Sequence, residues 1–221
     1  MPRGVFITFE GGDGSGKSTQ AAKLVEQLTA AGYTVLRTRE PGGTEVGLEI
    51  RELVLHHHGD IVPRAEALLY AADRAHHIAT VVRPALEAGT IVVQDRYLDS
   101  SVAYQGVGRE LDAAEIRELS LWATENLLPD LTVLLDIDEA DARRRLDSAN
   151  KRFDRLEAEA SDFHARVRTA FLALAEVERE RFLVVDGAAS ADELAVRIAG
   201  RVEELLAARG INAPEPGHLG R

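Results

Sequence analysis

The chain contains no cysteine, which excludes disulfide bonds and thiolate metal sites. It also lacks any apolar run that approaches the roughly 20 residues of a membrane-spanning helix. Its first residues, Met1–Gly4, lead at once into an apolar segment and leave no room for the apolar region of a signal peptide. These absences predict a cytoplasmic protein with no membrane association and no redox control.

Positive charge is in deficit. The 221 residues include 26 Lys and Arg against 37 Asp and Glu, which gives a formal net charge of −11. This balance argues against broad electrostatic binding of nucleic acid or of an anionic membrane. Anionic ligands would need local positive charge, and basic residues do gather at Arg143–Arg145 and within Lys151–Arg155. Such a cluster is usually a solvated helix face, so its position has to decide its role.

A glycine-rich segment, Gly11–Ser18, has the spacing Gly, four residues, Gly, Lys, Ser that cradles a polyphosphate. It lies between an apolar run at 5–9 and a segment of helical composition at 19–31, the context that such a loop requires. Glycines let backbone N–H groups approach phosphate oxygens, Lys17 would neutralise the β and γ oxygens, and Ser18 would offer its hydroxyl to Mg²⁺. The alternative is a glycine-rich turn with an unrelated lysine. The predicted nucleotide-binding residues are Gly11, Gly12, Asp13, Gly14, Ser15, Gly16, Lys17, Ser18 and Thr19.

Apolar runs alternate with helical patterns along the chain. They predict strands at 5–9, 34–36, 90–94, 131–137 and 182–186, and helices at 19–31, 44–54, 63–88, 112–125, 138–146, 162–181 and 190–208. This alternation indicates an α/β fold, a five-stranded parallel sheet with helices on both faces. In the helix at 112–125 we expect Leu119, Leu121 and Trp122 to face inward. We expect one domain over residues 1–209, with a charged, mobile lid at about 147–156 and a disordered tail at 210–221.

Polar residues follow the carboxyl ends of the second and third strands, where an open α/β sheet binds ligands. Asp95 could hold Mg²⁺ directly or through water, or simply cap the next helix. The segment Ser100–Gly106 carries hydroxyls, a phenol and an amide, which suit a nucleoside. Tyr70 and Arg74 are four residues apart and share a helix face, where an aromatic plane could lie beside a fork of donors. A core tyrosine beside a surface arginine would give the same pattern.

Three motifs together resemble the thymidylate kinase family. They are Gly11–Ser18 with Asp13 inside, Arg39–Thr44, and Asp95-Arg96-Tyr97 followed by Ser101 and Tyr104-Gln105. The resemblance covers about residues 4–209 and implies a P-loop fold of the nucleoside monophosphate kinase type. It implies the reaction ATP + dTMP → ADP + dTDP, with Mg²⁺ between the β and γ oxygens, and it implies a homodimer.

The resemblance also implies a role for each matching position. Arg51 and Arg96 would grip the 5′-phosphate of dTMP, and Tyr70 would stack on thymine. Arg74 would donate to the base, and Tyr104 would lie near C2′ and disfavour a ribose hydroxyl. The substrate-binding residues expected are Asp13, Arg39, Pro41, Arg51, Tyr70, Arg74, Asp95, Arg96, Ser101, Tyr104 and Gln105, and the metal-binding residues are Ser18 and Asp95.

The lid distinguishes branches of this family. One branch carries a basic residue directly after the P-loop aspartate, where this chain has Gly14, so the chain resembles the bacterial branch with a basic lid. A basic lid residue would close over ATP and neutralise charge on the transferring phosphoryl group. The candidates are Arg145, Lys151, Arg152 and Arg155, beside Lys17 and Arg96 as catalytic groups, and the sequence leaves open which lid residue acts.

Two other functions stay open. A kinase for another nucleoside monophosphate or for a deoxynucleoside would share the phosphate loop, although a nucleoside acceptor calls for a general base and leaves two phosphate-directed arginines without a role. A nucleotide-dependent switch would leave Tyr70 and Arg74 unexplained, and the chain has no guanine-reading motif of the Asn/Thr-Lys-x-Asp type.

Overall fold

The computed structural model describes residues 4–148, 154–157 and 159–213. Its strands form one sheet in the order β2-β3-β1-β4-β5, and each neighbouring pair is parallel. The predicted α/β architecture is therefore confirmed. The strands are β1 (Phe6–Glu10), β2 (Val35–Arg39), β3 (Ile91–Asp95), β4 (Leu131–Asp136) and β5 (Phe182–Asp186).

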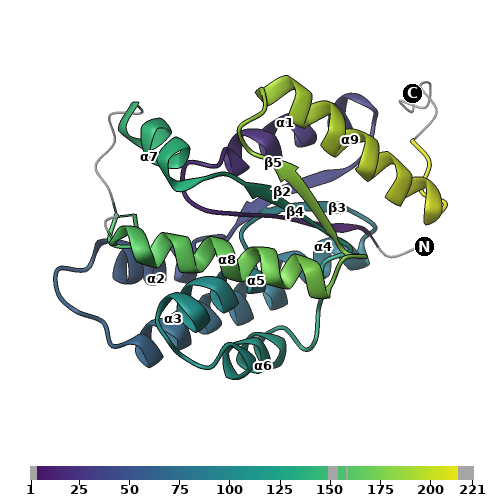
Figure 1. Ribbon diagram of the computed structural model, residues 1–221. Helices are drawn as coiled ribbons and strands as arrows, with labels where there is room; N and C mark the ends of the chain where they lie inside the picture. Colours follow the sequence, from purple (N-terminus) through teal and green to yellow (C-terminus); the bar gives the residue numbers. More distant parts are fainter. Residues whose placement is uncertain (1–3, 149–153, 158, 214–221) are drawn as a thin grey trace.

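Helices cover both faces of the sheet (Figure 1). Helices α1 (Lys17–Ala30) and α9 (Ala191–Ala208) pack together on one face, and α8 (Ser161–Val177) lies on the other with the helices between β2 and β4. The remaining described helical segments are α2 (Glu45–His56), α3 (Pro63–His77), η1 (Ile78–Val82, π-helical), α4 (Arg83–Glu87), α5 (Leu98–Ser101), η2 (Val102–Gly108, π-helical), α6 (Ala113–Ala123) and α7 (Glu139–Ser148). None of the described helices is long and apolar enough to cross a membrane.

The central strand β1 is buried on both faces, which explains its continuous apolar run. Ile7 and Phe9 pack with the core under α1 and α9, whereas Phe6 belongs to a core on the other face with Val92 and Tyr97. Because all five strands run the same way, their carboxyl ends meet at one edge of the sheet. That edge is where the predicted ligand-binding residues come together.

Helix ends follow the capping chemistry of the sequence. Thr44 accepts a hydrogen bond from the Gly47 amide at the start of α2, and Ser190 and Glu193 form a reciprocal capping box at the start of α9. Helix α7 continues to Ser148, into the predicted lid, and residues 154–157, which include the end of that lid, form a turn. Ile211, in the predicted tail, packs against the core under α1 and α9, and residues 214–221 lie outside the described residues.

The expectation for α6 was wrong at Trp122, whose side chain is 79% exposed, whereas Leu119 and Leu121 are half-buried. The buried residues of this helix are Ile116 and Ser120, four positions apart. Trp122 follows Ser120 by two residues, about 200° around the helix, and so faces away from the core. An apolar pattern could not find this inward stripe because one of its members is a serine.

Candidate active site

A cavity of about 680 Å³ lies at the carboxyl edge of the sheet. It is bounded by the segments that follow β1, β2, β3 and β5, by α2 and α3, and by the turn at 154–157. Gly11 and Gly12 instead line a neighbouring cavity of about 460 Å³ behind the loop. The sequence-predicted residues that line the larger cavity are Asp13, Gly14, Ser15, Gly16, Lys17, Ser18, Thr19, Arg39, Pro41, Arg51, Tyr70, Arg74, Asp95, Arg96, Ser101, Tyr104, Gln105 and Arg145.

The glycine-rich loop runs directly into α1. Gly16 is the N-cap of this helix with φ of 96°, a backbone conformation that glycine adopts without strain. Gly14, with φ of 77°, lies against α7, and a Cβ there would stand 2.6 Å from the Ala142 carbonyl oxygen. The loop therefore presents backbone N–H groups and a helix N-terminus to the cavity, the arrangement that binds phosphate.

Lys17 is buried at the base of this loop. Its Nζ donates to the Gly12 carbonyl at 2.7 Å and lies 3.5 Å from Ser15 Oγ. Burial, and then the positive charge of Arg96, lower the pKa of Lys17 to about 8. The ammonium group is thus poorly solvated, so an anion in the cavity would stabilise it.

Ser18 and Asp95 meet although 77 positions separate them in the chain. Ser18 Oγ donates to Asp95 Oδ2 at 2.5 Å, which brings a hydroxyl and a carboxylate together beside the phosphate loop. These are oxygen ligands, the kind that Mg²⁺ prefers. The chemistry of the pair fits the predicted metal site, in which phosphate oxygens would be further ligands.

Arg96 stands between the loop and the rest of the cavity. Its Nη1 donates to the Gly11 carbonyl at 3.1 Å and to Ser100 Oγ at 3.2 Å, and its Nη2 pairs with Asp13. Tyr104 donates to the other carboxylate oxygen of Asp13 at 3.2 Å. Burial alone would raise the pKa of Asp13, but Arg96 and Lys17 outweigh it and hold that pKa below its ordinary value. Asp13 is therefore an ionised, fixed group.

Glu10, which the sequence analysis missed, contacts the residues next to Arg96. It ends β1, is fully buried and accepts hydrogen bonds from the Tyr97 amide at 2.8 Å and from Ser100 Oγ at 2.5 Å. Burial, and then the charge of Asp99, raise its pKa to about 8. The only signal in the sequence is a carboxylate at the end of a buried strand, which also fits an exposed strand terminus.

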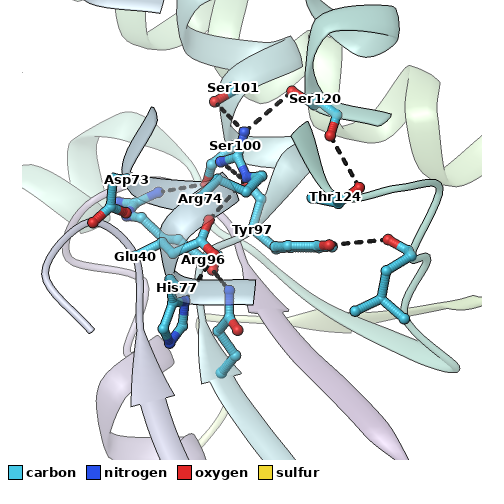
Figure 2. Close-up of polar contacts among 12 residues, drawn as sticks. Glu40, Asp73, Arg74, His77, Arg96, Tyr97, Ser100, Ser101, Ser120 and Thr124 are labelled. Atoms are coloured by element: carbon cyan, nitrogen blue, oxygen red, sulfur yellow. Dashed lines mark hydrogen bonds and ion pairs between the residues drawn. The ribbon is translucent and has the colours of Figure 1, made fainter. Parts of the chain in front are cut away.

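Arg74 lies at the centre of a buried polar network on the other side of the cavity (Figure 2). Its Nε donates to Glu40 at 2.8 Å, and Glu40 also pairs with His77 Nδ1 at 2.9 Å. Arg74 and the cavity-lining Tyr70 do share one face of α3, as predicted. Arg51 reaches the same cavity from α2, with its Nη1 on the Pro41 carbonyl at 3.0 Å.

Another buried carboxylate, that of Glu66, organises the wall beside Tyr70. Gln105 donates to it at 3.0 Å, Arg109 donates to it through two nitrogens at 3.3 Å each, and Arg155 pairs with it through Nη2. Burial opposes ionisation of Glu66, but these donors outweigh it and lower its pKa.

The predicted lid residues separate in space. Arg145 on α7 lines the cavity, whereas Arg155 is turned toward Glu66 and the Val54 carbonyl and does not line it. Lys151 and Arg152 lie outside the described residues. The structure thus brings one described lid arginine to the cavity and holds another on a buried carboxylate outside it.

Several cavity residues were not among the predicted site residues, although Asp154 and Leu156 fall in the predicted lid. Small residues after β5 and the first turns of α9 lie at the cavity end next to the phosphate loop, and the turn at 154–157 forms part of the opposite wall. Their residue types are common everywhere, so a single sequence could not mark them. They are Gln20, Leu55, Leu146, Asp154, Leu156, Glu157, Ala189, Ala191 and Leu194.

Comparison with known proteins agrees with this geometry. The family model described as thymidylate kinase matches residues 9–198. The thymidylate kinase of Leifsonia xyli subsp. xyli is 70% identical over 200 residues, which cover 90% of this chain and 95% of the relative. That of Clavibacter michiganensis subsp. michiganensis is 68% identical over 205 residues, 93% and 97% of the two chains. The crystal structure of thymidylate kinase from Ehrlichia chaffeensis superposes with a TM-score of 0.74 at 30% identity, covering 91% of this chain and 99% of that one. The chain belongs to the thymidylate kinase family.

Proposed function

We propose that the protein transfers the γ-phosphoryl group of ATP to the 5′-phosphate of dTMP, with Mg²⁺ at the phosphate loop. Phosphorylation of dTMP is the activity of its family, and the chain is a nucleoside monophosphate kinase. The observation that carries the proposal is that the phosphate loop and the predicted nucleoside residues line one cavity, with Arg96 between them. Such a cavity can bring two phosphorylated compounds together while fixed positive groups offset their repulsion.

At the phosphate end, the backbone of the loop and the N-terminus of α1 would bind the β- and γ-phosphates, and Lys17 would donate to their oxygens. Ser18 and Asp95 would hold Mg²⁺, which would neutralise charge on the β and γ oxygens when bound. The small residues Ala189 and Ala191 leave space for the adenine ring next to the loop.

At the nucleoside end, Arg51 and Arg96 would bind the 5′-phosphate of dTMP, and Arg39 and Pro41 would line that position. Tyr70 would stack on thymine, because it lines the cavity on the same helix face as Arg74. Arg74, Ser101 and Gln105 would contact the base, while Tyr104 and Asp13 would face the sugar. No general base is needed, because the acceptor phosphate is already an anion.

Charge on the transferring phosphoryl group would be neutralised by Arg96 and by the lid. Arg145 is the lid arginine with direct support, since its side chain lines the cavity. Arg152 keeps its predicted role from the sequence alone. Arg155 stays a predicted catalytic residue without support from its position, because Glu66 holds its guanidinium elsewhere.

The proposal includes a homodimer of single-domain subunits, residues 1–209, each with a lid at about 147–156, in the cytoplasm. Large apolar side chains are exposed on three helices that pack in series, α2 against α3 and α3 against α6. A second copy covering these helices would bury the exposed side chains. These side chains are Leu48, Leu53, Leu68 and Trp122.

One assay tests the proposal: ADP release from ATP with dTMP, dUMP, dCMP, thymidine or no acceptor. We expect rapid release with dTMP, slower release with dUMP, and release at the blank rate with thymidine. The Lys17→Ala variant controls for contaminating kinases. If dTMP gives no more ADP than the blank, the proposed function is wrong.

A further inference from the structure

Arg74 is held by four residues from three separate segments of the chain (Figure 2). Its side chain is 2% exposed. Besides the Nε bond to Glu40, its Nη2 donates to the Tyr97 carbonyl at 3.1 Å, and its Nη1 donates to Ser101 Oγ and to Ser120 Oγ at 3.1 Å each. A guanidinium has five N–H groups. Four are therefore committed, and one Nη2 hydrogen has no acceptor within the described residues. Because Arg74 lines the cavity, we take this hydrogen as the one that a ligand would accept.

Ser120 differs from the other three partners. Glu40, Tyr97 and Ser101 line the cavity, whereas Ser120 lies on α6 outside the cavity lining, with a side chain 1% exposed. It occupies the inward position of α6 that an apolar residue would otherwise fill. Its hydroxyl is one of two acceptors that hold Nη1, so it restricts rotation of the guanidinium without reaching the ligand.

We propose that Ser120 is a positioning residue that sets the orientation of Arg74 and thereby the preference for a base with a carbonyl oxygen at the 4-position. The inference rests on the proposed role of Arg74 as donor to the base. Thymine and uracil present an acceptor at this position, whereas cytosine presents an amino donor. A guanidinium with one uncommitted N–H in a fixed place can donate to thymine or uracil. It would oppose the amino group of cytosine, donor against donor. Without Ser120 Oγ, one buried Nη1 hydrogen has no acceptor, so the guanidinium can shift to satisfy it and the discrimination weakens.

The test compares steady-state kinetics of Ser120→Ala and wild type with dTMP, dUMP and dCMP. Weakening of the hydrogen bond that the displaced guanidinium would donate to the base predicts a rise of about 5- to 30-fold in KM for dTMP. We expect kcat and KM for ATP to stay within about twofold. The kcat/KM ratio of dTMP to dCMP should fall by a similar factor, while the ratio of dTMP to dUMP should not change. Ser120→Thr, which keeps the hydroxyl, should restore the wild-type values.

Thr124→Val is the matched control. Thr124 lies one turn further along the same helix, is fully buried, and donates its hydroxyl to the Ser120 carbonyl at 3.0 Å. Its removal disturbs α6 without taking an acceptor from Arg74, so base selectivity should be unchanged. Equal effects of Thr124→Val and Ser120→Ala on selectivity would overturn the proposal. Ser120→Cys, nearly equal in volume but a weak acceptor, gives the same test if the alanine variant folds poorly.

Arg74→Lys separates this inference from the proposed function. If Arg74→Lys raises KM for dTMP and lowers the dTMP to dCMP ratio while Ser120→Ala does neither, the role of Ser120 is wrong and that of Arg74 stands. If Arg74→Lys changes neither quantity, the proposed contact with the base is wrong, and the inference falls with it.

Discussion

The two ends of the cavity are built in different ways. At the phosphate end, the lining residues 13–19 are contiguous in the chain, and backbone N–H groups with one lysine would supply the binding groups. At the nucleoside end, the side chains proposed to contact the base are fixed by buried carboxylates. Glu40 holds Arg74, and Glu66 holds Gln105.

This difference determines what each end tolerates. A backbone cradle keeps its shape when surface side chains change, and its affinity depends on few residues. A buried arginine and carboxylate hold each other in place, and removing one leaves an uncompensated charge in a dry environment. We therefore expect substitutions at the phosphate end to abolish turnover, and those at the nucleoside end to alter substrate affinity and stability.

The largest effect is expected for Lys17→Ala. Loss of the ammonium that would stabilise charge on the β and γ oxygens should lower kcat by about 10³-fold. The thermal transition should change little, because the burial of Lys17 is itself unfavourable to its charge. Steady-state kinetics at saturating ATP and dTMP, with circular dichroism as the folding control, check this. Turnover within tenfold of wild type would contradict the role of Lys17.

The next effect separates two lid arginines. Arg145→Ala should lower kcat by about 10²-fold with little change in KM for dTMP, because its side chain lines the cavity. Arg155→Ala should instead raise KM for dTMP and leave kcat within a few-fold. Its backbone amide, Nε and Nη2 anchor the turn at 154–157 to Leu55, Val54 and Glu66, and Asp154 and Leu156 of that turn line the cavity.

Arg144→Ala is the matched control for this pair, since Arg144 is a neighbour of Arg145 on α7, is exposed and pairs locally with Asp141. It should behave as wild type. A fall in kcat of about 10²-fold for Arg155→Ala at saturating substrates would mean that Arg155 leaves Glu66 and reaches the phosphoryl group, as the sequence resemblance predicts.

The phosphate end could be predicted from the sequence because its information is local. The spacing Gly11–Ser18, the flanking strand and helix, and the capping residues Thr44 and Ser190 all act over a few positions. The parallel sheet followed from the alternation of strands and helices. These features depend on backbone geometry, which a short pattern specifies.

The support of the nucleoside end could not be predicted in this way. Glu66 looks like any polar residue of an amphipathic helix, and its partners Gln105 and Arg155 are 39 and 89 positions away. Ser120 and Trp122 illustrate the same limit, since the apolar pattern favoured the tryptophan as the inward residue. A buried polar network is a property of the fold, and periodicity assigns its members to the surface.

The pH profile of kcat/KM distinguishes the two ends, and the expected change is smaller than the changes in kcat described above. Lys17 has its pKa lowered to about 8, so it is charged below that pH and neutral above it. We expect kcat/KM for ATP to be level below pH 8 and to fall about tenfold per pH unit above it. The kcat at saturating ATP should stay level further, because bound phosphates favour the charged lysine. A break near pH 8 in kcat/KM for dTMP would implicate Glu10 instead, whose carboxyl holds Ser100 beside Arg96.

The smallest effect on turnover is expected for Asp73→Asn. This variant also tests directly what a buried charge costs at the nucleoside end. Asp73 on α3 is fully buried; its Oδ1 accepts from the Gly42 amide at 3.1 Å, and its Oδ2 has no partner among the described residues. Burial, and then the charge of Glu40, raise its pKa to about 6. A raised pKa means that the folded state binds the proton more tightly than the unfolded state. This contribution to stability is present below the unfolded value near 3.8 and is lost as the pH rises through 6.

The asparagine variant cannot lose this contribution, so its free energy of unfolding relative to wild type should rise by up to about 3 kcal/mol between pH 4 and 7.5. Urea denaturation across this range measures the difference. Asp192→Asn is the control, because Asp192 is exposed and its pKa is lowered, so it stays ionised over most of the window. If Asp73→Asn and wild type show the same pH dependence, ionised carboxylates are tolerated beside Glu40 without cost. The nucleoside end would then be no more dependent on buried charge than the phosphate loop, and the distinction between the two ends would fail.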